Sequence, residues 1–190
     1  MSAILSYNKK PSLKNAINKV LFIDEKYKIL SLKSFLSIKE YNCVSDLLKS
    51  KDLKNKILSF DINSKVRIIL VSLKSNFKNS DLENLGAKFY DIFKSSKIKV
   101  FQINSDTMPQ NKDNVVGYFL HGLMLKSYKF EKYKSKKNKK DLSIFVLGSN
   151  KPSTKDQLKF KAIEDGTFYT RDLVSEPGNI LHPDEYAKRL

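Results

Sequence analysis

The sequence predicts a layered α/β/α domain with a mixed central sheet, followed by a long linker helix. Runs of residues typical of strands alternate with helical patterns along the chain, which favours an α/β domain over a helical bundle or a β-sandwich. Two of these runs lie close enough together to form a hairpin, so we expect a mixed sheet. The 190 residues are 41% hydrophobic, which suffices for one substantial core.

Five segments have the composition of β-strands. The run from Leu142 to Leu147 is continuously apolar and ends at Gly148, as a central strand would, whereas Lys97–Ile103 alternates polar and apolar residues. Asn63 and Ser64 form the predicted turn of the hairpin. The predicted strands cover Val20–Ile23, Lys56–Asp61, Lys65–Leu73, Lys97–Ile103 and Leu142–Leu147.

Three helices separate or follow these strands. The first is predicted to begin with a capping box at Ser80 and Glu83, and the second to begin after Asp113. A third begins near Thr154 and Gln157 and ends before Pro177. The apolar faces of the first two helices comprise Leu82, Leu85, Phe89, Ile92 and Phe93, and Val116, Phe119, Leu120 and Leu123.

The last thirty residues differ from the rest of the chain. A stripe of mostly small residues (Ala162, Gly166, Tyr169 or Thr170, and Leu173) suggests close packing along the third helix. Gly178 and Asn179 form a predicted turn, and Pro183 begins another helix with acids in its first turn. We therefore expect a main domain at 1–152, a linker helix at 153–177, and the start of a second domain at 178–190.

Charge and cysteine content bound the class of protein. The net charge is +16, but only Arg67, Arg171 and Arg189 are arginines among 36 basic residues, so the forked side chain suited to phosphate recognition is scarce. Lys, Asn and Ile are all encoded by A/T-rich codons, so a biased genome composition is a simple source of the positive charge. Cys43 is the single cysteine, and the longest aliphatic run, Ile68–Val71, is far too short to span a membrane. No apolar leader is visible either. We therefore expect a cytoplasmic protein with no membrane association.

The most biased segment is Lys126–Lys140, which carries eight lysines and interleaved aromatic residues. One interpretation is a strip that attracts and stacks single-stranded nucleic acid. The other, which we favour, is a solvated loop that follows a helix and whose aromatic residues pack on the core. Weak, non-specific binding of nucleic acid is compatible with either interpretation.

Residues for catalysis or metal binding do not assemble in the sequence. There is no glycine-rich phosphate loop, nucleophile elbow or zinc motif. His121 and His182 have no partners at metal-ligand spacing, so each is interpreted as a core or surface histidine. Cys43 is interpreted as a buried, inert thiol. We therefore assign no catalytic residue and no metal ligand.

One motif identifies a family. Residues 171–183 read RDLVSEPGNILHP, which resembles the R-D-L-x-N-x-P-x-N-x-L-T-P linker of the cytosolic leucyl aminopeptidases. The matching positions are structural: Arg171, Asp172, Leu173, Pro177, Asn179 and Pro183. Ser175 and His182 depart from the family pattern. Gly117–Lys134 and Gly86–Ala87 resemble two further family segments, so the resemblance extends over most of residues 20–190.

The resemblance implies a fold and an activity. Members of this family are homohexameric metallo-exopeptidases that release N-terminal residues, often Leu, from peptides in intracellular protein turnover. Two divalent ions, Mn, Zn or Mg, activate water in the C-terminal catalytic domain, and their ligands all lie there. The N-terminal domain is macro-domain-like and contributes to hexamer assembly and active-site access. The resemblance thus implies a non-catalytic chain that binds no metal and whose partner is its own C-terminal catalytic domain.

An alternative keeps the same fold. Macro-like folds can bind ADP-ribose, and some bacterial members of the family bind DNA, so the chain could be a stand-alone module that binds a nucleotide or nucleic acid. The missing glycine-rich loop argues against the nucleotide, and only the lysine excess favours nucleic acid. The aminopeptidase interpretation is therefore the leading one.

Overall fold

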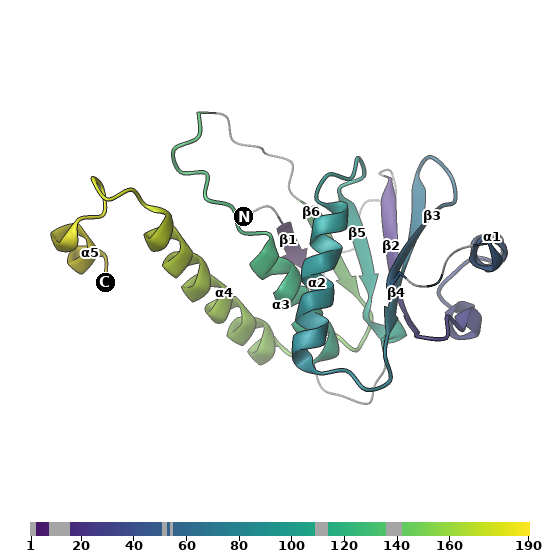
Figure 1. Ribbon diagram of the computed structural model, residues 1–190. Helices are drawn as coiled ribbons and strands as arrows, with labels where there is room; N and C mark the ends of the chain where they lie inside the picture. Colours follow the sequence, from purple (N-terminus) through teal and green to yellow (C-terminus); the bar gives the residue numbers. More distant parts are fainter. Residues whose placement is uncertain (1–2, 8–15, 51–52, 54, 109–113, 136–141) are drawn as a thin grey trace.

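A six-stranded sheet forms the centre of the protein in a computed structural model that describes residues 3–7, 16–50, 53, 55–108, 114–135 and 142–190. The strands are β1 (Ala3–Ser6), β2 (Ile17–Asp24), β3 (Ile57–Asp61), β4 (Val66–Leu73), β5 (Val100–Asn104) and β6 (Leu142–Leu147). Their order is β1-β6-β5-β2-β4-β3 (Figure 1). Only β3 runs antiparallel to its neighbour, so the mixed sheet predicted from the hairpin is confirmed.

The alternation of side chains along the central strands builds two cores. In β2, Val20 and Phe22 point into one core, whereas Leu21 and Ile23 point into the other. Helices α2 (Asn79–Phe93) and α3 (Val115–Lys126) cover the first face. The second face is covered by the 3-10 helix η1 (Ile29–Leu32) and α1 (Ile38–Lys49), on the opposite side of the sheet in Figure 1. The predicted layered α/β architecture is confirmed.

Helices α2 and α3 approach each other so closely that glycine is required at the contact. A Cβ atom on Gly86 would lie 1.9 Å from the backbone oxygen of Phe119, and one on Gly122 would lie 2.0 Å from the backbone oxygen of Glu83. Both glycines thus let one helix backbone rest on the other. Below them, the Phe119 ring meets the Phe22 ring edge-on at 5.3 Å between centroids, which ties the helix pair to the sheet.

The predicted start of the helix near Thr154 is confirmed, whereas the capping box predicted at Ser80 and Glu83 is wrong. Helix α2 begins at Asn79, and the backbone N–H of Lys78 donates to Asp81 (2.8 Å), so the predicted box at Ser80 and Glu83 does not form. Helix α4 (Thr154–Ser175) is capped by Ser153, whose Oγ accepts from the backbone N–H of Asp156 at 3.1 Å. In both helices the hydrogen-bonded pair precedes the pair that the sequence pattern suggested, and in both an acid stands at the third helical position.

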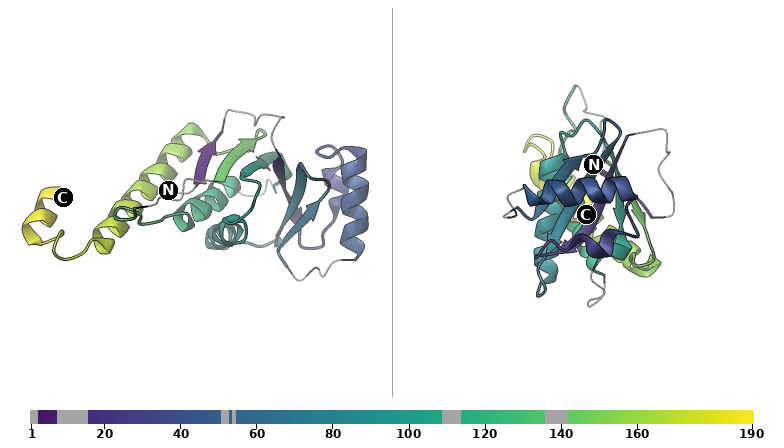
Figure 2. Two further views of the ribbon diagram at one scale, coloured as in Figure 1. Left: turned by 90° about the horizontal axis from the view of Figure 1, so that it is seen from above. Right: turned by 90° about the vertical axis from the view of Figure 1, so that its right-hand side faces the viewer.

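Helix α4 leaves the sheet and carries α5 (Pro183–Arg189) at its far end (Figures 1 and 2). The predicted helices in both places are confirmed. Only Glu164 and Phe168 of α4 are fully buried. A Cβ atom added to Gly166 would have no neighbouring atom within 4 Å, so the small-residue stripe packs against nothing at this position in the described part of the chain. Of the described helices, none combines the length and apolarity needed to cross a membrane.

Candidate functional site

The residues predicted from the linker motif lie where α4 meets the end of α3. The Arg171 guanidinium donates to the backbone oxygen of Leu125 at 2.6 Å, and so satisfies a carbonyl in the last turn of α3. Tyr128, just beyond that turn, donates its hydroxyl proton to Asp172 at 2.7 Å. The guanidinium also lies over the Tyr128 ring, 5.5 Å from its centroid. Arg171 and Asp172 therefore fasten the linker helix to the main domain.

The other motif residues shape the exit from the helix. Leu173 is half-buried, whereas Pro177, Asn179 and Pro183 are exposed. Helix α4 ends as the chain becomes extended at Glu176, and the backbone oxygen of Pro177 accepts from the N–H groups of Ile180 and Leu181 at 2.9 and 3.0 Å. This turn reverses the chain before Pro183 begins α5, as the spacing of prolines and glycine predicts.

Glu176 is the central residue of the contacts around the end of α4, and the sequence motif did not include it. Its side chain is only 2% exposed and accepts hydrogen bonds from Lys132 Nζ, from the Tyr133 hydroxyl and, at 3.1 Å, from Arg189 of α5. The bonds from Lys132 and then Tyr133 lower the pKa of Glu176 to about 2. One carboxylate thus joins three segments: the chain after α3, the end of α4, and α5.

The spacing of the two acids is a signal that could have indicated this junction. Asp172 and Glu176 are four residues apart, which is the spacing that places two side chains on one face of a helix. Their partners, Tyr128 and Tyr133, lie about 44 residues earlier in the chain and belong to the lysine-rich segment. We name the set formed by Tyr128, Lys132, Tyr133, Arg171, Asp172, Glu176 and Arg189 the linker junction.

The linker junction changes the interpretation of Lys126–Lys140. Tyr128 packs on a buried residue as expected, lying 5.4 Å from the Phe168 ring of the linker helix, whereas Phe130 and Tyr133 pack on each other at 5.7 Å. Lys132 forms an ion pair with Glu176. The lysines at 136, 137, 139 and 140 lie outside the described residues. In its described part, the segment packs against the C-terminal half of α4.

The two histidines and the cysteine lie in three different places in the fold. His121, on α3, is 5% exposed and its Nδ1 lies 3.3 Å from Glu164 Oε1 on α4, so it is a core histidine with a buried carboxylate partner. His182 is exposed and caps α5. Cys43 is half-buried rather than fully buried. Within the described ranges, no group of three or more His, Cys, Asp and Glu side chains could hold a metal ion.

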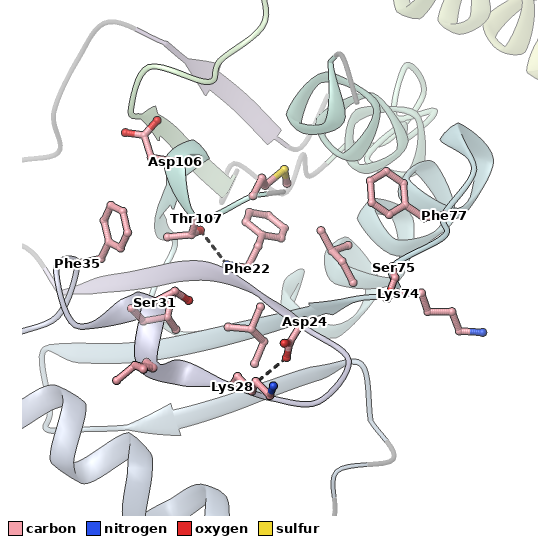
Figure 3. A pocket seen from close by; sticks show the side chains of 15 residues that line it. Phe22, Asp24, Lys28, Ser31, Phe35, Lys74, Ser75, Phe77, Asp106 and Thr107 are labelled. Atoms are coloured by element: carbon pink, nitrogen blue, oxygen red, sulfur yellow. Dashed lines mark hydrogen bonds between the residues drawn. The ribbon is translucent and has the colours of Figure 1, made fainter. Parts of the chain in front are cut away.

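A cavity of about 570 Å³ opens at the carboxyl ends of β2, β4 and β5 (Figure 3). The chain leaves β2 toward the α1 face and leaves β5 toward the α3 face, so neighbouring strands diverge here. Such a divergence at the carboxyl edge is where parallel sheets typically bind ligands. The aromatic part of the wall comprises Phe22, Phe35 and Phe77, and the polar part includes Asp24, Lys28, Ser75, Asp106 and Thr107.

Hydrogen bonds fix the polar wall of this cavity. The Thr107 hydroxyl accepts from the backbone N–H of Phe22 at 2.9 Å, and Asp24 accepts from the backbone N–H of Lys28 at 3.0 Å (Figure 3). Asp106 accepts from the backbone and hydroxyl of Ser149 and from the backbone of Asn150. Burial opposes ionisation of Asp106, but these hydrogen bonds outweigh it and lower its pKa. The cavity therefore presents fixed hydrogen-bonding groups beside aromatic rings.

Comparison with known proteins relates the chain to one family. No protein-family profile matches it. A probable cytosol aminopeptidase of Sulfurihydrogenibium is 30% identical over 161 residues, which cover 76% of this chain and 32% of that protein. A leucine aminopeptidase from tomato has the same fold over 98% of this chain and 41% of its own, with a TM-score of 0.69 and 18% identity. A bottromycin maturation enzyme solved in complex with manganese matches 91% of this chain and 34% of its own, at a TM-score of 0.62 and 12% identity.

Proposed function

This chain is a relative of the cytosol aminopeptidases and matches the N-terminal domain of their fold, and on this premise we propose that it is the non-catalytic N-terminal portion of a metallo-exopeptidase. That enzyme releases N-terminal amino acids, often Leu, from peptides in the cytoplasm. The chain spans about a third of the length of the curated relatives it matches. Catalysis is therefore assigned to a C-terminal domain that follows α5 in the whole protein.

The linker junction is the observation that carries this proposal. Helix α4 has few buried residues, yet its end is fastened to the main domain and to α5 by a cluster of charged and aromatic side chains. A helix that only completed this domain would need no such fixed exit. The junction supports a role in which α4 and α5 hold a following domain at a set direction, and so contribute to active-site access and to assembly of a hexamer.

The described residues do not fit a di-metal site. A pair of catalytic divalent ions needs several His or carboxylate ligands close together, and no such group is found among the described side chains. The two ions of the proposed enzyme, Mn, Zn or Mg, belong with its C-terminal domain.

The proposal is tested by activity and by mass. We expect the purified 190-residue chain to leave leucine p-nitroanilide uncleaved in manganese buffer, while a complete cytosol aminopeptidase cleaves it in the same buffer. Hydrolysis by the pure chain that a chelator abolishes would contradict the assignment. In the source cells, the intact polypeptide is expected to have a mass well above 21.9 kDa; a mass equal to that value would favour a stand-alone module.

A second candidate function rests on the cavity at the strand ends. Its position and its aromatic and polar wall suit a nucleotide such as ADP-ribose, the ligand class of the stand-alone alternative. Calorimetric titration with ADP-ribose tests it, and saturable binding that is lost in Thr107→Val would favour it. Nucleic-acid binding is tested by a salt titration, in which a steep loss of affinity without sequence preference indicates simple attraction between opposite charges.

A further inference from the structure

A second cavity, of about 390 Å³, lies between β1 and the N-terminal half of α4, where Figure 2 shows the helix passing beside the strand. It shares no lining residue with the cavity of Figure 3 or with the linker junction. Small-molecule sites commonly occupy about 300–1,000 Å³. The apolar part of its wall comprises Ala3, Ile4, Leu5, Met124, Leu158 and Phe160. We name this cavity the β1–α4 groove.

A buried carboxylate lies in this apolar wall. Glu164 lines the groove and is only 4% exposed. Its partner is the His121 ring, 3.3 Å away, and no lysine or arginine of the described residues forms an ion pair with it. The nearby Lys161 is paired with Asp165 instead, at 2.5 Å. Burial of an ionised carboxylate is costly unless a positive charge or several hydrogen bonds compensate.

Tyr7, a second polar group close to Glu164, cannot supply that compensation. Tyr7 lines the same groove, and burial together with the negative charge of Glu164 raises its pKa to about 12. Tyr7 is thus a neutral phenol at pH 7 and carries no positive charge. The groove therefore combines apolar walls with a buried carboxylate whose described partner is a histidine ring, while the lysine in its wall, Lys161, is held by Asp165. An alkyl chain that bears an ammonium group is the complement of such a groove.

We propose that the β1–α4 groove binds an apolar primary amine, with its ammonium group on the Glu164 carboxylate and its alkyl part against Leu5, Met124 and Leu158. Two sources share this chemistry: the amino end of a peptide and a free amino acid. A free amino acid also carries a carboxylate, which Glu164 would repel at this short distance. We therefore expect the peptide amino end to bind more tightly. The inference goes beyond the proposed function because it concerns binding by this portion without turnover.

The test is a calorimetric titration of the 190-residue chain at pH 7 with three matched probes. Leucinamide carries the ammonium group without the carboxylate, leucine carries both, and N-acetyl-leucinamide carries neither. We expect saturable binding of leucinamide, weaker binding of leucine and none of N-acetyl-leucinamide. Leucine binding as tightly as leucinamide would keep the site and assign it to free amino acids. Equal binding of N-acetyl-leucinamide, or binding of none of the three, would overturn the proposal.

Two pairs of variants locate the binding. Glu164→Gln keeps the shape of the side chain and is expected to weaken leucinamide binding by about tenfold or more, because a charge-assisted hydrogen bond is lost. Asp46→Asn removes an exposed acid on α1, which is paired with Lys49 and does not line the groove, so it is the control and is expected to change binding less than about twofold. Unchanged affinity in Glu164→Gln would overturn the site.

Leu158→Lys provides a second test, which leaves the buried Glu164 unchanged. Leu158 is 66% exposed, so its replacement leaves the fold intact, and a cation at the rim repels the ligand. Val174→Lys, 82% exposed at the other end of α4, adds the same charge away from the groove. Binding lost only in Leu158→Lys supports the proposal, and equal loss in both variants contradicts it. Peptidase activity of the whole enzyme is assayed separately, so failure of either proposal is distinguished from failure of the other.

Discussion

The α2–α3 layer and helix α4 are attached to the domain by different kinds of contact, because the layer packs on the sheet whereas α4 packs on α3 and the segment that follows it. Helices α2 and α3 meet backbone to backbone through glycines and bury a continuous apolar surface against the sheet. Helix α4 buries only Glu164 and Phe168 and is held chiefly by aromatic pairs and by hydrogen bonds at its end. Apolar burial contributes most of the free energy of folding, whereas exposed polar contacts mainly fix orientation. The α2–α3 layer therefore provides most of the stability, and α4 sets the direction in which the chain leaves the domain.

The largest expected effect is in the layer. Phe119→Ala removes a fully buried ring that contacts Phe22 and Phe89, so we expect the free energy of unfolding to fall by about 3–5 kcal/mol. Chemical denaturation followed by circular dichroism measures it. Phe119→Leu retains most of the apolar volume and is expected to cost less. A fall below about 1 kcal/mol in Phe119→Ala would show that the layer is not the main source of stability.

The two regions should respond in opposite directions to the same substitution. Gly122→Ala forces its new Cβ into the backbone of Glu83, so we expect a loss of about 1–3 kcal/mol as the helices separate. Gly166→Ala, on α4, meets no neighbour and should gain about 0.5–1 kcal/mol, because alanine favours the helix. Thermal unfolding compares the two variants. Equal changes in stability from both substitutions would show that α4 is packed as closely as the α2–α3 layer.

The linker junction should be sensitive to acid. The pKa of Glu176 is about 2, below its ordinary value of 4.5, so the carboxylate stabilises the folded junction above pH 4.5, and this contribution is lost as the pH falls toward 2. We expect the protection of amides from exchange, relative to an unstructured chain at the same pH, to fall at the end of α4 and in α5 over that range. Glu176→Gln should remove this pH dependence while global unfolding of the sheet changes little. Asp165→Asn on the exposed face of α4 is the control.

The smallest effect is expected from one hydroxyl group. Tyr128→Phe keeps the ring over Arg171 and near Phe168 but removes the hydrogen bond to Asp172. We expect a loss of about 0.5–1.5 kcal/mol in the local stability of the α3–α4 contact, measured by exchange of the amides in the last turn of α4. A change in global stability of the same size would mean that α4 unfolds together with the layer.

Much of the fold could be predicted because its central strands and helices carry strong local patterns. Leu142–Leu147 and the hairpin around Asn63 are long apolar or alternating runs, and α3 is apolar almost throughout. Strand β1 was missed because four residues provide too short a pattern, and its partner β6 is 139 residues away in the chain. Helix α1 was missed although Ser37 and Glu40 form a complete capping box, which was a usable signal.

The candidate site was less predictable than the fold. The motif drew attention to Arg171 and Asp172, which do contact the end of α3 and Tyr128. The motif did not include Glu176, and only its four-residue spacing from Asp172 was a usable signal, because its three partners come from two other segments. Contacts between residues more than 40 positions apart depend on how helices are arranged in space. Local patterns do not determine that arrangement, and the division of the chain at 152 and 177 stays a prediction.

The place of β1 in the sheet has a consequence for synthesis. Of the described strands, β1 is translated first and pairs in parallel with β6, which is translated last. At about 5–20 residues per second, β1 spends several seconds without its partner, while β2, β4 and β5 can already assemble. The nascent domain therefore closes from its middle outward, and its N-terminal edge is completed only when Leu147 has been translated.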